Sequence, residues 1–251
     1  MYKIIKNVVL PLLLLVPMTI QVHAAETGRI VETYSCHYID GKGAKDLDSA
    51  VEFWQSQLKK IDSADLNKYF GAVLMPIKGG TDADFFWLGG SPNLNVYARG
   101  QNDYNRSSEG QAADARFAKM SKCTSNMYFS EQIYAGAPPE EGDTEAILQS
   151  YGCTLNKGKT MANVLAFEKI VIANSEALKA KTNIYRLTPY MSNTPADVVY
   201  LVGYDDLVSF GSESTDFMTS PGYDGVISAL SDTMDCNSGL AAMEVVHTPM
   251  E

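Results

Sequence analysis

The sequence has 251 residues, of which 45% are hydrophobic and 20% are charged, so it can form one large folded domain or two of ordinary size. This composition argues against a disordered chain and against a coiled coil. Acidic residues outnumber Lys and Arg by 30 to 20. That balance argues against a nucleic-acid-binding protein, because phosphate neutralisation requires clustered basic side chains.

The first 24 residues have the features of a secretory signal peptide. Lys3 and Lys6 provide the positive start, residues 8–20 form an apolar run, and residues 22–24 form a small-residue cleavage site. The apolar run is too short to span a bilayer comfortably and no second run follows, so a retained membrane anchor is not expected. We expect a periplasmic or secreted mature protein that begins at Ala25.

After the signal peptide, the sequence shows the pattern of a strand, a helix, two strands, a second helix and a last strand. Short runs of β-branched and aromatic residues indicate the strands, and apolar residues at helical spacing indicate the helices. Asp46 is placed to cap the start of the first helix. In chain order the predicted elements are strand 29–38, helix 47–61, strands 69–77 and 83–89, helix 113–120 and strand 123–134.

The same pattern occurs twice, because the two halves of the mature sequence align. Residues 30–36 (IVETYSC) match residues 147–153 (ILQSYGC). After a four-residue deletion, Pro76 aligns with Pro189, and each half has one cysteine near its start and one near its end. The alignment predicts an internal duplication.

The segment between the halves, residues 136–145, contains two prolines and no apolar periodicity, which is typical of an exposed linker. The predicted organisation is therefore a signal peptide over 1–24, a first repeat over 25–135, this linker, and a second repeat over 146–248.

The order of elements in each repeat is that of the ferredoxin-like unit. In this unit both helices pack on one face of the sheet and leave the other face uncovered, so two units can bury those faces against each other. The sequence thus predicts an α+β fold of two tandem ferredoxin-like βαββαβ units that pack sheet to sheet.

The four cysteines, Cys36, Cys123, Cys153 and Cys236, are an even number in an oxidising destination, which predicts two disulfides. The first and last strands of a ferredoxin-like unit are antiparallel neighbours, and one cysteine stands at each of the ends that meet. We expect Cys36 to pair with Cys123 and Cys153 with Cys236, and a crossed pairing between the repeats is the alternative. Because no pair has C-x-x-C spacing, no metal site is expected.

In its topology, and in the pattern of Pro76, Ala83-Asp84 and Gly90 that recurs in the second half, the sequence resembles the dimeric α/β-barrel superfamily, which includes antibiotic-biosynthesis-monooxygenase-like proteins. The resemblance implies an intramolecular barrel, compatible with a monomer, and small apolar or aromatic ligands held between the sheet and the helices of a unit. Members include cofactor-independent oxygenases, haem-degrading enzymes, isomerases and proteins without known activity. The likeness therefore informs the fold more than the function.

Candidate functional residues lie on the predicted strands and on the first helix. Trp54 and Trp87 are candidates to line an aromatic ligand pocket, with core packing as the alternative role. His37 is a candidate general base, or a partly exposed residue at a strand end. Asp84 and its copy Asp197 are candidates for a paired acid-base site, or they begin a strand after a turn.

The polar stretch from Ser91 to Gln111 is expected to be a loop, placed where a flap covers a pocket mouth. It contains Arg99 and Arg106, candidates to hold an anionic ligand group, and Tyr104, a further candidate ligand contact. A polar surface loop without a binding role is the alternative.

The sequence contains no G-x-S-x-G elbow, H-E-x-x-H zinc site, P-loop or G-x-G-x-x-G before a helix. Our leading hypothesis is an exported barrel that binds a small apolar or aromatic molecule without a cofactor or a tightly held metal. One alternative is a cofactor-independent oxygenase or isomerase in which His37 or Asp84 moves a proton. Arg99 or Arg106 would then stabilise the developing charge. The other alternative is a structural or interaction scaffold.

Overall fold

The computed structural model describes residues 28–79, 81–136 and 144–249. The predicted signal peptide (1–24) and most of the predicted linker (136–145) lie outside the described residues. Within the described part of the chain, no helix is long and apolar enough to cross a membrane.

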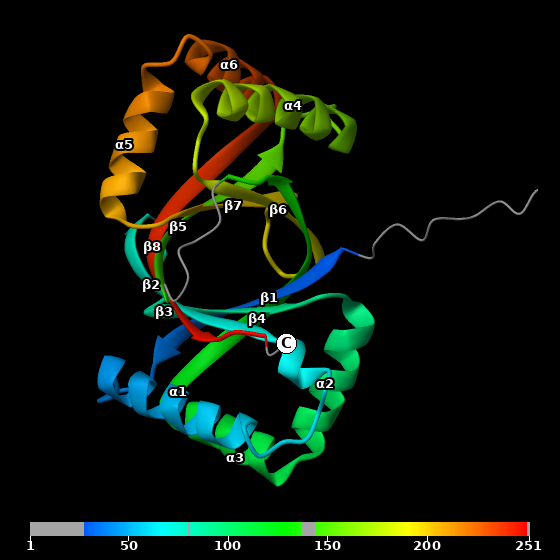
Figure 1. The fold of residues 1–251 in the computed structure, drawn as a ribbon, viewed down its shortest axis with the longest axis vertical. Helices are drawn as coiled ribbons and strands as arrows, with labels where there is room; N and C mark the ends of the chain where they lie inside the picture. The colour runs from blue at the N-terminus through cyan, green and yellow to red at the C-terminus, as the bar shows by residue number, and fades with distance from the viewer. Residues whose placement is uncertain (1–27, 80, 137–143, 250–251) are drawn as a thin grey trace, which may run out of the picture.

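Each repeat forms a four-stranded antiparallel sheet with helices on the outside (Figure 1). The first repeat consists of β1 (Arg29–Tyr38), α1 (Ala44–Leu58), a 3-10 turn (Leu66–Lys68), β2 (Phe70–Gly79), β3 (Phe85–Ser91), α2 (Leu94–Arg106), α3 (Ser108–Phe117) and β4 (Ser121–Tyr134). The second repeat consists of β5 (Glu145–Leu155), α4 (Met161–Leu178), β6 (Asn183–Met191), β7 (Val198–Tyr204), α5 (Leu207–Met218), α6 (Tyr223–Thr233) and β8 (Met234–His247).

The two sheets join into one closed barrel with the strand order β1-β3-β2-β8-β5-β7-β6-β4. β2 pairs with β8 and β4 pairs with β6, so backbone hydrogen bonds connect the repeats at both edges. Buried apolar side chains, among them Ala72, Leu74 and Leu88, form a core cluster together with residues of both repeats. The predicted α+β class and the packing of two ferredoxin-like units into an intramolecular barrel are confirmed.

Strand alternation assigns neighbouring residues of β1 to two different layers. Glu32 and Cys36 face the helices of the first repeat, whereas Val31 belongs to the cluster formed with residues of both repeats. On α1, Leu47 and Trp54 belong to the buried stripe that packs on the sheet. The space between the sheet and the helices therefore receives an acidic side chain as well as apolar ones.

The predicted loop over residues 91–111 is wrong, because this stretch folds into α2 and the start of α3. The Asn93 side chain accepts a hydrogen bond from the backbone N–H of Val96 at 3.0 Å and caps the start of α2. The buried residues of α2 are Val96, Gly100 and Tyr104. They form one narrow stripe with a spacing of four residues. Because the other residues of the helix are mostly polar, the sequence shows little of the apolar periodicity that indicates a helix.

The predicted disulfide pairing is confirmed. Cys36 lies opposite Cys123 in the β1–β4 register, and Cys153 lies opposite Cys236 in the β5–β8 register. The Cα atoms of each pair are 4.1 Å apart and each pair forms a disulfide. The crossed pairing between the repeats is excluded, and each disulfide ties the first strand of a repeat to its last strand.

Candidate functional site

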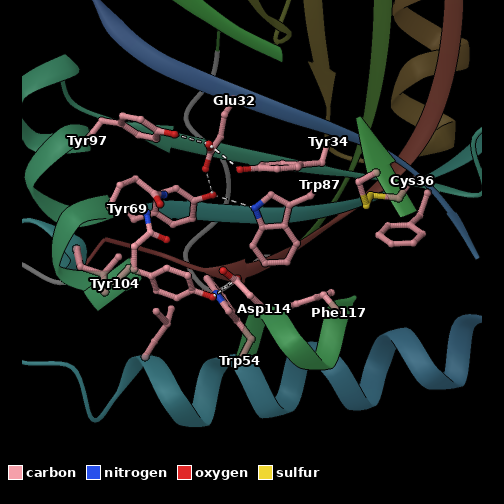
Figure 2. A pocket seen from close by; sticks show the side chains of 16 residues that line it. Glu32, Tyr34, Cys36, Trp54, Tyr69, Trp87, Tyr97, Tyr104, Asp114 and Phe117 are labelled. Atoms are coloured by element: carbon pink, nitrogen blue, oxygen red, sulfur yellow. Dashed lines mark hydrogen bonds between the residues drawn. A yellow bond between two sulfur atoms is a disulfide. The ribbon is translucent and has the colours of Figure 1, made fainter. Parts of the chain in front are cut away.

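The first repeat contains a cavity of about 480 Å³ between its sheet and helices α1, α2 and α3 (Figure 2). We call it the first cavity. Half of its lining residues are aromatic, and Glu32 and Asp114 are its charged residues. The lining residues are Glu32, Tyr34, Cys36, Trp54, Leu58, Leu66, Tyr69, Phe85, Trp87, Tyr97, Gln101, Tyr104, Asn105, Asp114, Phe117 and Cys123.

Glu32 is the centre of a hydrogen-bonded cluster at this cavity (Figure 2). Its carboxylate is buried, with 5% of the residue exposed. Three hydroxyl groups donate to it: Tyr69 to Oε1 at 2.8 Å, Tyr97 to Oε2 at 2.8 Å and Tyr34 to Oε2 at 3.1 Å. The indole N–H of Trp87 donates to the Tyr69 hydroxyl at 2.9 Å and extends the cluster along the cavity.

Burial determines the protonation of this cluster. Burial raises the pKa of Glu32 above its usual value, although the three tyrosine hydrogen bonds act in the opposite direction. Burial and the nearby carboxylate also raise the pKa of Tyr34, Tyr69 and Tyr97, so their hydroxyls stay protonated and donate. Among the ion pairs of the described residues, none joins Glu32 to a Lys or Arg side chain.

The cluster requires a glycine on the neighbouring strand. Gly89 of β3 lies opposite Glu32 in the β1–β3 register. A Cβ at this position would lie 1.9 Å from the Tyr69 hydroxyl oxygen and 2.9 Å from Cγ of Glu32. The absence of a side chain at Gly89 therefore lets Tyr69 reach the carboxylate.

Asp114 on α3 is the second carboxylate of the first cavity. Its Oδ1 accepts a hydrogen bond from the Tyr104 hydroxyl of α2 at 2.9 Å. Burial raises the pKa of Asp114 and outweighs the lowering effect of that bond. The rings of Trp54 and Trp87 meet edge to face with their centroids 4.8 Å apart, so two indoles form one corner of the cavity.

The structure separates the binding residues proposed from the sequence into two groups. Trp54, Trp87 and Tyr104 line the first cavity. Arg99 and Arg106 are exposed on α2 and do not line it. Arg99 instead forms an ion pair with an aspartate of the preceding segment, so neither arginine is placed to hold a group inside the cavity.

His37 and Asp84, the two candidate proton carriers, also lie outside the first cavity. His37 is exposed near the end of β1. Oδ2 of Asp84 accepts a hydrogen bond from the backbone N–H of Tyr38 at 2.7 Å, and Oδ2 of Asp197 accepts one from Leu155 at 2.8 Å. Both repeats make the same contact, so in each of them this aspartate links the start of one strand to the end of the neighbouring strand.

Glu32, Tyr69, Tyr97 and Asp114 were not identified from the sequence. The alternation of β1 contained a signal for Glu32, because it places this acidic residue on the same face as Cys36. The other three residues come from separate segments, and only the tertiary structure brings them to one cavity.

The second repeat contains a larger cavity of about 690 Å³ between its sheet and helices α4, α5 and α6. Gln149 takes the place of Glu32 there and accepts a hydrogen bond from the Tyr204 hydroxyl at 3.3 Å. The buried carboxylate of this repeat is Glu168 on α4. It accepts a hydrogen bond from Tyr200 at 3.0 Å and forms an ion pair at 2.6 Å with Arg186, which also pairs with Glu131, so Glu168 has a cationic partner within the protein.

No known protein family matches the sequence, and no curated protein is significantly similar to it. Solved structures with a similar fold do exist. A candidate monooxygenase from Fusobacterium nucleatum has a TM-score of 0.59 and 12% identity, over 88% of this chain and 93% of that chain. A haem-binding protein from Thermus thermophilus has a TM-score of 0.52 and 9% identity, over 87% and 91%. An anthrone oxidase-like protein has a TM-score of 0.50 and 8% identity, over 90% and 96%.

At these identities the comparison establishes the fold alone, which is the dimeric α/β barrel. The residues present do not fit haem, because neither cavity is lined by a histidine and all four cysteines form disulfides. Burial raises the pKa of Tyr200 and Tyr204 in the second cavity, which disfavours a tyrosinate ligand. Among the described residues, no group of three or more metal-binding side chains occurs.

We expect Gly89→Ala to separate Tyr69 from Glu32, because the added methyl group would overlap both side chains. Overpacking of this kind lowers the free energy of unfolding by about 1 to 3 kcal/mol. Gly90→Ala is the matched control, since the nearest heavy atom to its Cβ is Phe70 Cβ at 3.6 Å. Urea unfolding and near-UV circular dichroism of both variants measure the effect, and equal stability of the two variants would contradict the assigned role of Gly89.

We expect Glu32→Gln to change the pH dependence of stability. A carboxyl group whose pKa is raised by folding stabilises the folded state at low pH, and this contribution is lost as the pH rises through its folded pKa. The wild-type protein should therefore lose stability relative to the variant as the pH rises above 4.5, the ordinary value for glutamate. Tyr34, Tyr69 and Tyr97 stay protonated in this range, and Asp114 is present in both proteins.

Urea unfolding of the two proteins between about pH 4 and about pH 8 provides the measurement. A stability difference that stays constant over this range would show that Glu32 titrates in the folded protein as it does in the unfolded chain.

Proposed function

We propose that this protein, which has the dimeric α/β-barrel fold, binds a small and mostly aromatic molecule in the first cavity. The observation that carries the proposal is a cavity of about 480 Å³ lined by aromatic rings, with a small number of polar groups held in place by hydrogen bonds. Ligand sites commonly have volumes of about 300 to 1,000 Å³ and combine apolar walls with a few fixed polar groups.

We further propose that the protein acts in an oxidising compartment, either the periplasm or the cell exterior. The support is the pair of disulfides, which persist in such compartments. The signal peptide expected over residues 1–24 belongs to the same proposal.

The outer helices of the second repeat carry exposed apolar side chains, a feature relevant to the scaffold alternative. Leu165 and Ile170 on α4 and Val208 on α5 are examples. Met218 and Ile227, which are also exposed, line the second cavity. The exposure of these two residues is therefore explained by their position at a cavity rather than by a partner surface. Ligand binding remains our main proposal.

Proton transfer by Glu32 is a second candidate function, favoured by its raised pKa inside an aromatic cavity. An ionised Glu32 would take a proton from an acidic carbon or hydroxyl group of a bound substrate, as a cofactor-independent oxygenase or isomerase requires. In this proposal Glu32 replaces His37 and Asp84 as the proton carrier. The fold similarity to a candidate monooxygenase and an anthrone oxidase-like protein is in accord with it.

If Glu32 transfers protons, the protein should catalyse exchange of the benzylic hydrogens of phenylacetone with deuterated solvent, which proton NMR follows. Glu32→Gln should abolish the exchange, and Glu52→Gln, which removes an exposed carboxylate of α1, should not. Exchange that continues at the wild-type rate in Glu32→Gln would rule out this role.

If the first cavity binds an aromatic ligand, titration with phenylbutanol should change the tryptophan fluorescence saturably. The chain has two tryptophans, Trp54 and Trp87, and both line the first cavity, so a ligand bound there lies beside the fluorophores. Absence of a saturable change with either phenylbutanol or its amine analogue would contradict the proposed function.

A pair of matched variants locates the binding. Leu58→Phe adds volume at a buried position that lines the first cavity, and it should weaken phenylbutanol binding several-fold. Leu165→Phe makes the same replacement at an exposed position on α4 and should leave binding unchanged. Equal affinities of the two variants would place the ligand elsewhere.

A further inference from the structure

We infer that the first cavity is built for an organic cation, such as an amine attached to an apolar or aromatic body, with its ammonium group held by Glu32 and the surrounding rings. The inference rests on the proposed function, because it specifies the ligand class of the same cavity. It is carried by three features of the described residues: an unbalanced pair of carboxylates, the arrangement of aromatic rings, and the contrast with the second repeat.

The first feature is the charge of the cavity. Its two charged residues, Glu32 and Asp114, are both acidic, and no Lys, Arg or His lines it. A neighbouring hollow of about 370 Å³ shares Glu32, Tyr34 and Tyr97, and its lining also contains no basic side chain. A buried carboxylate without a cationic partner costs free energy, which a ligand ammonium group would offset.

The hydrogen bonds of Glu32 do not remove this imbalance. Its three tyrosine partners are neutral donors, so they orient the carboxylate but bring no positive charge. Tyr104 has the same relation to Asp114. Both carboxyl groups have a raised pKa, as expected for acids that lack a counterion.

The second feature is the set of rings beside these carboxylates. An ammonium group is attracted to the face of an aromatic ring, and most strongly to tryptophan. Trp54 meets Trp87 at 80° and Tyr69 at 66°, so rings in different orientations surround the space. The volume of about 480 Å³ accommodates an organic molecule, and the described residues offer no cluster of three or more metal ligands.

The third feature is the contrast with the second repeat, which serves as an internal control. Gln149 replaces Glu32 at the aligned position and is neutral. The buried carboxylate of that repeat, Glu168, is already paired with Arg186. The second repeat therefore adopts the same fold without an unpaired carboxylate on its first strand. The fold does not require Glu32, which occurs in the first repeat only.

The test compares two ligands that differ in charge and share the same apolar body. Phenylbutylamine, which is cationic at neutral pH, should bind the wild-type protein at least about tenfold more tightly than phenylbutanol, as measured by tryptophan fluorescence and calorimetry. Equal binding, or tighter binding of the alcohol, would overturn the inference and leave the proposed function in place. If neither ligand binds, both are overturned.

Variants then assign the preference to particular carboxylates. Glu32→Gln, which introduces the residue of the second repeat, should remove most of the preference for the amine while phenylbutanol still binds. Asp114→Asn should reduce the preference less, because Asp114 is exposed whereas Glu32 is buried. Glu52→Gln removes the same charge from the exposed surface of α1 and should leave the preference unchanged.

An amine preference that is equal in Glu32→Gln, Glu52→Gln and the wild-type protein would overturn the assignment to Glu32. The comparison of amine and alcohol on the wild-type protein needs no variant, so the inference stays testable even if Glu32→Gln does not fold. Circular dichroism of each variant identifies that case.

Discussion

Each four-stranded sheet of this chain would on its own expose two unpaired edges. Pairing of β2 with β8 and of β4 with β6 removes these edges and closes the barrel. The two sheets thereby share a core cluster that includes Ala72, Leu74 and Leu88. Both cavities lie in the outer layers, between a sheet and its helices. The polar chemistry of the first repeat is therefore carried on the side of the sheet that faces the helices.

The same strand register supports different chemistry in the two repeats. Glu32 lies opposite Gly89 in the first repeat, and Gln149 lies opposite Val202 in the second. The glycine leaves space for the Tyr69 hydroxyl beside the carboxylate. The two repeats thus share the backbone frame and the disulfide positions, whereas different residues at paired positions of neighbouring strands give a charged cluster in one repeat and a neutral amide in the other.

Helix α2 explains why Arg99 and Arg106 do not line the first cavity. As a loop, residues 91–111 would place Arg99 and Arg106 together with Tyr104 at a pocket mouth. As a helix, the segment turns Tyr97 and Tyr104 toward the first cavity and leaves both arginines exposed. Most side chains of this helix are polar and its buried stripe is narrow, so an analysis of apolar periodicity does not detect it. The helix therefore places Tyr104 at the first cavity and leaves Arg99 and Arg106 outside its lining.

The sequence by itself predicted two repeats of one pattern, the strand order within each repeat and, with a crossed pairing as the alternative, the pairing of Cys36 with Cys123 and of Cys153 with Cys236. These features follow from a repeated pattern and from the ends at which neighbouring strands meet. Only the tertiary structure decided that Glu32 meets the hydroxyls of Tyr69 and Tyr97, which are 37 and 65 residues away. The reason is physical: periodicity assigns a residue to a face, whereas a hydrogen bond depends on the positions of side chains from separate elements.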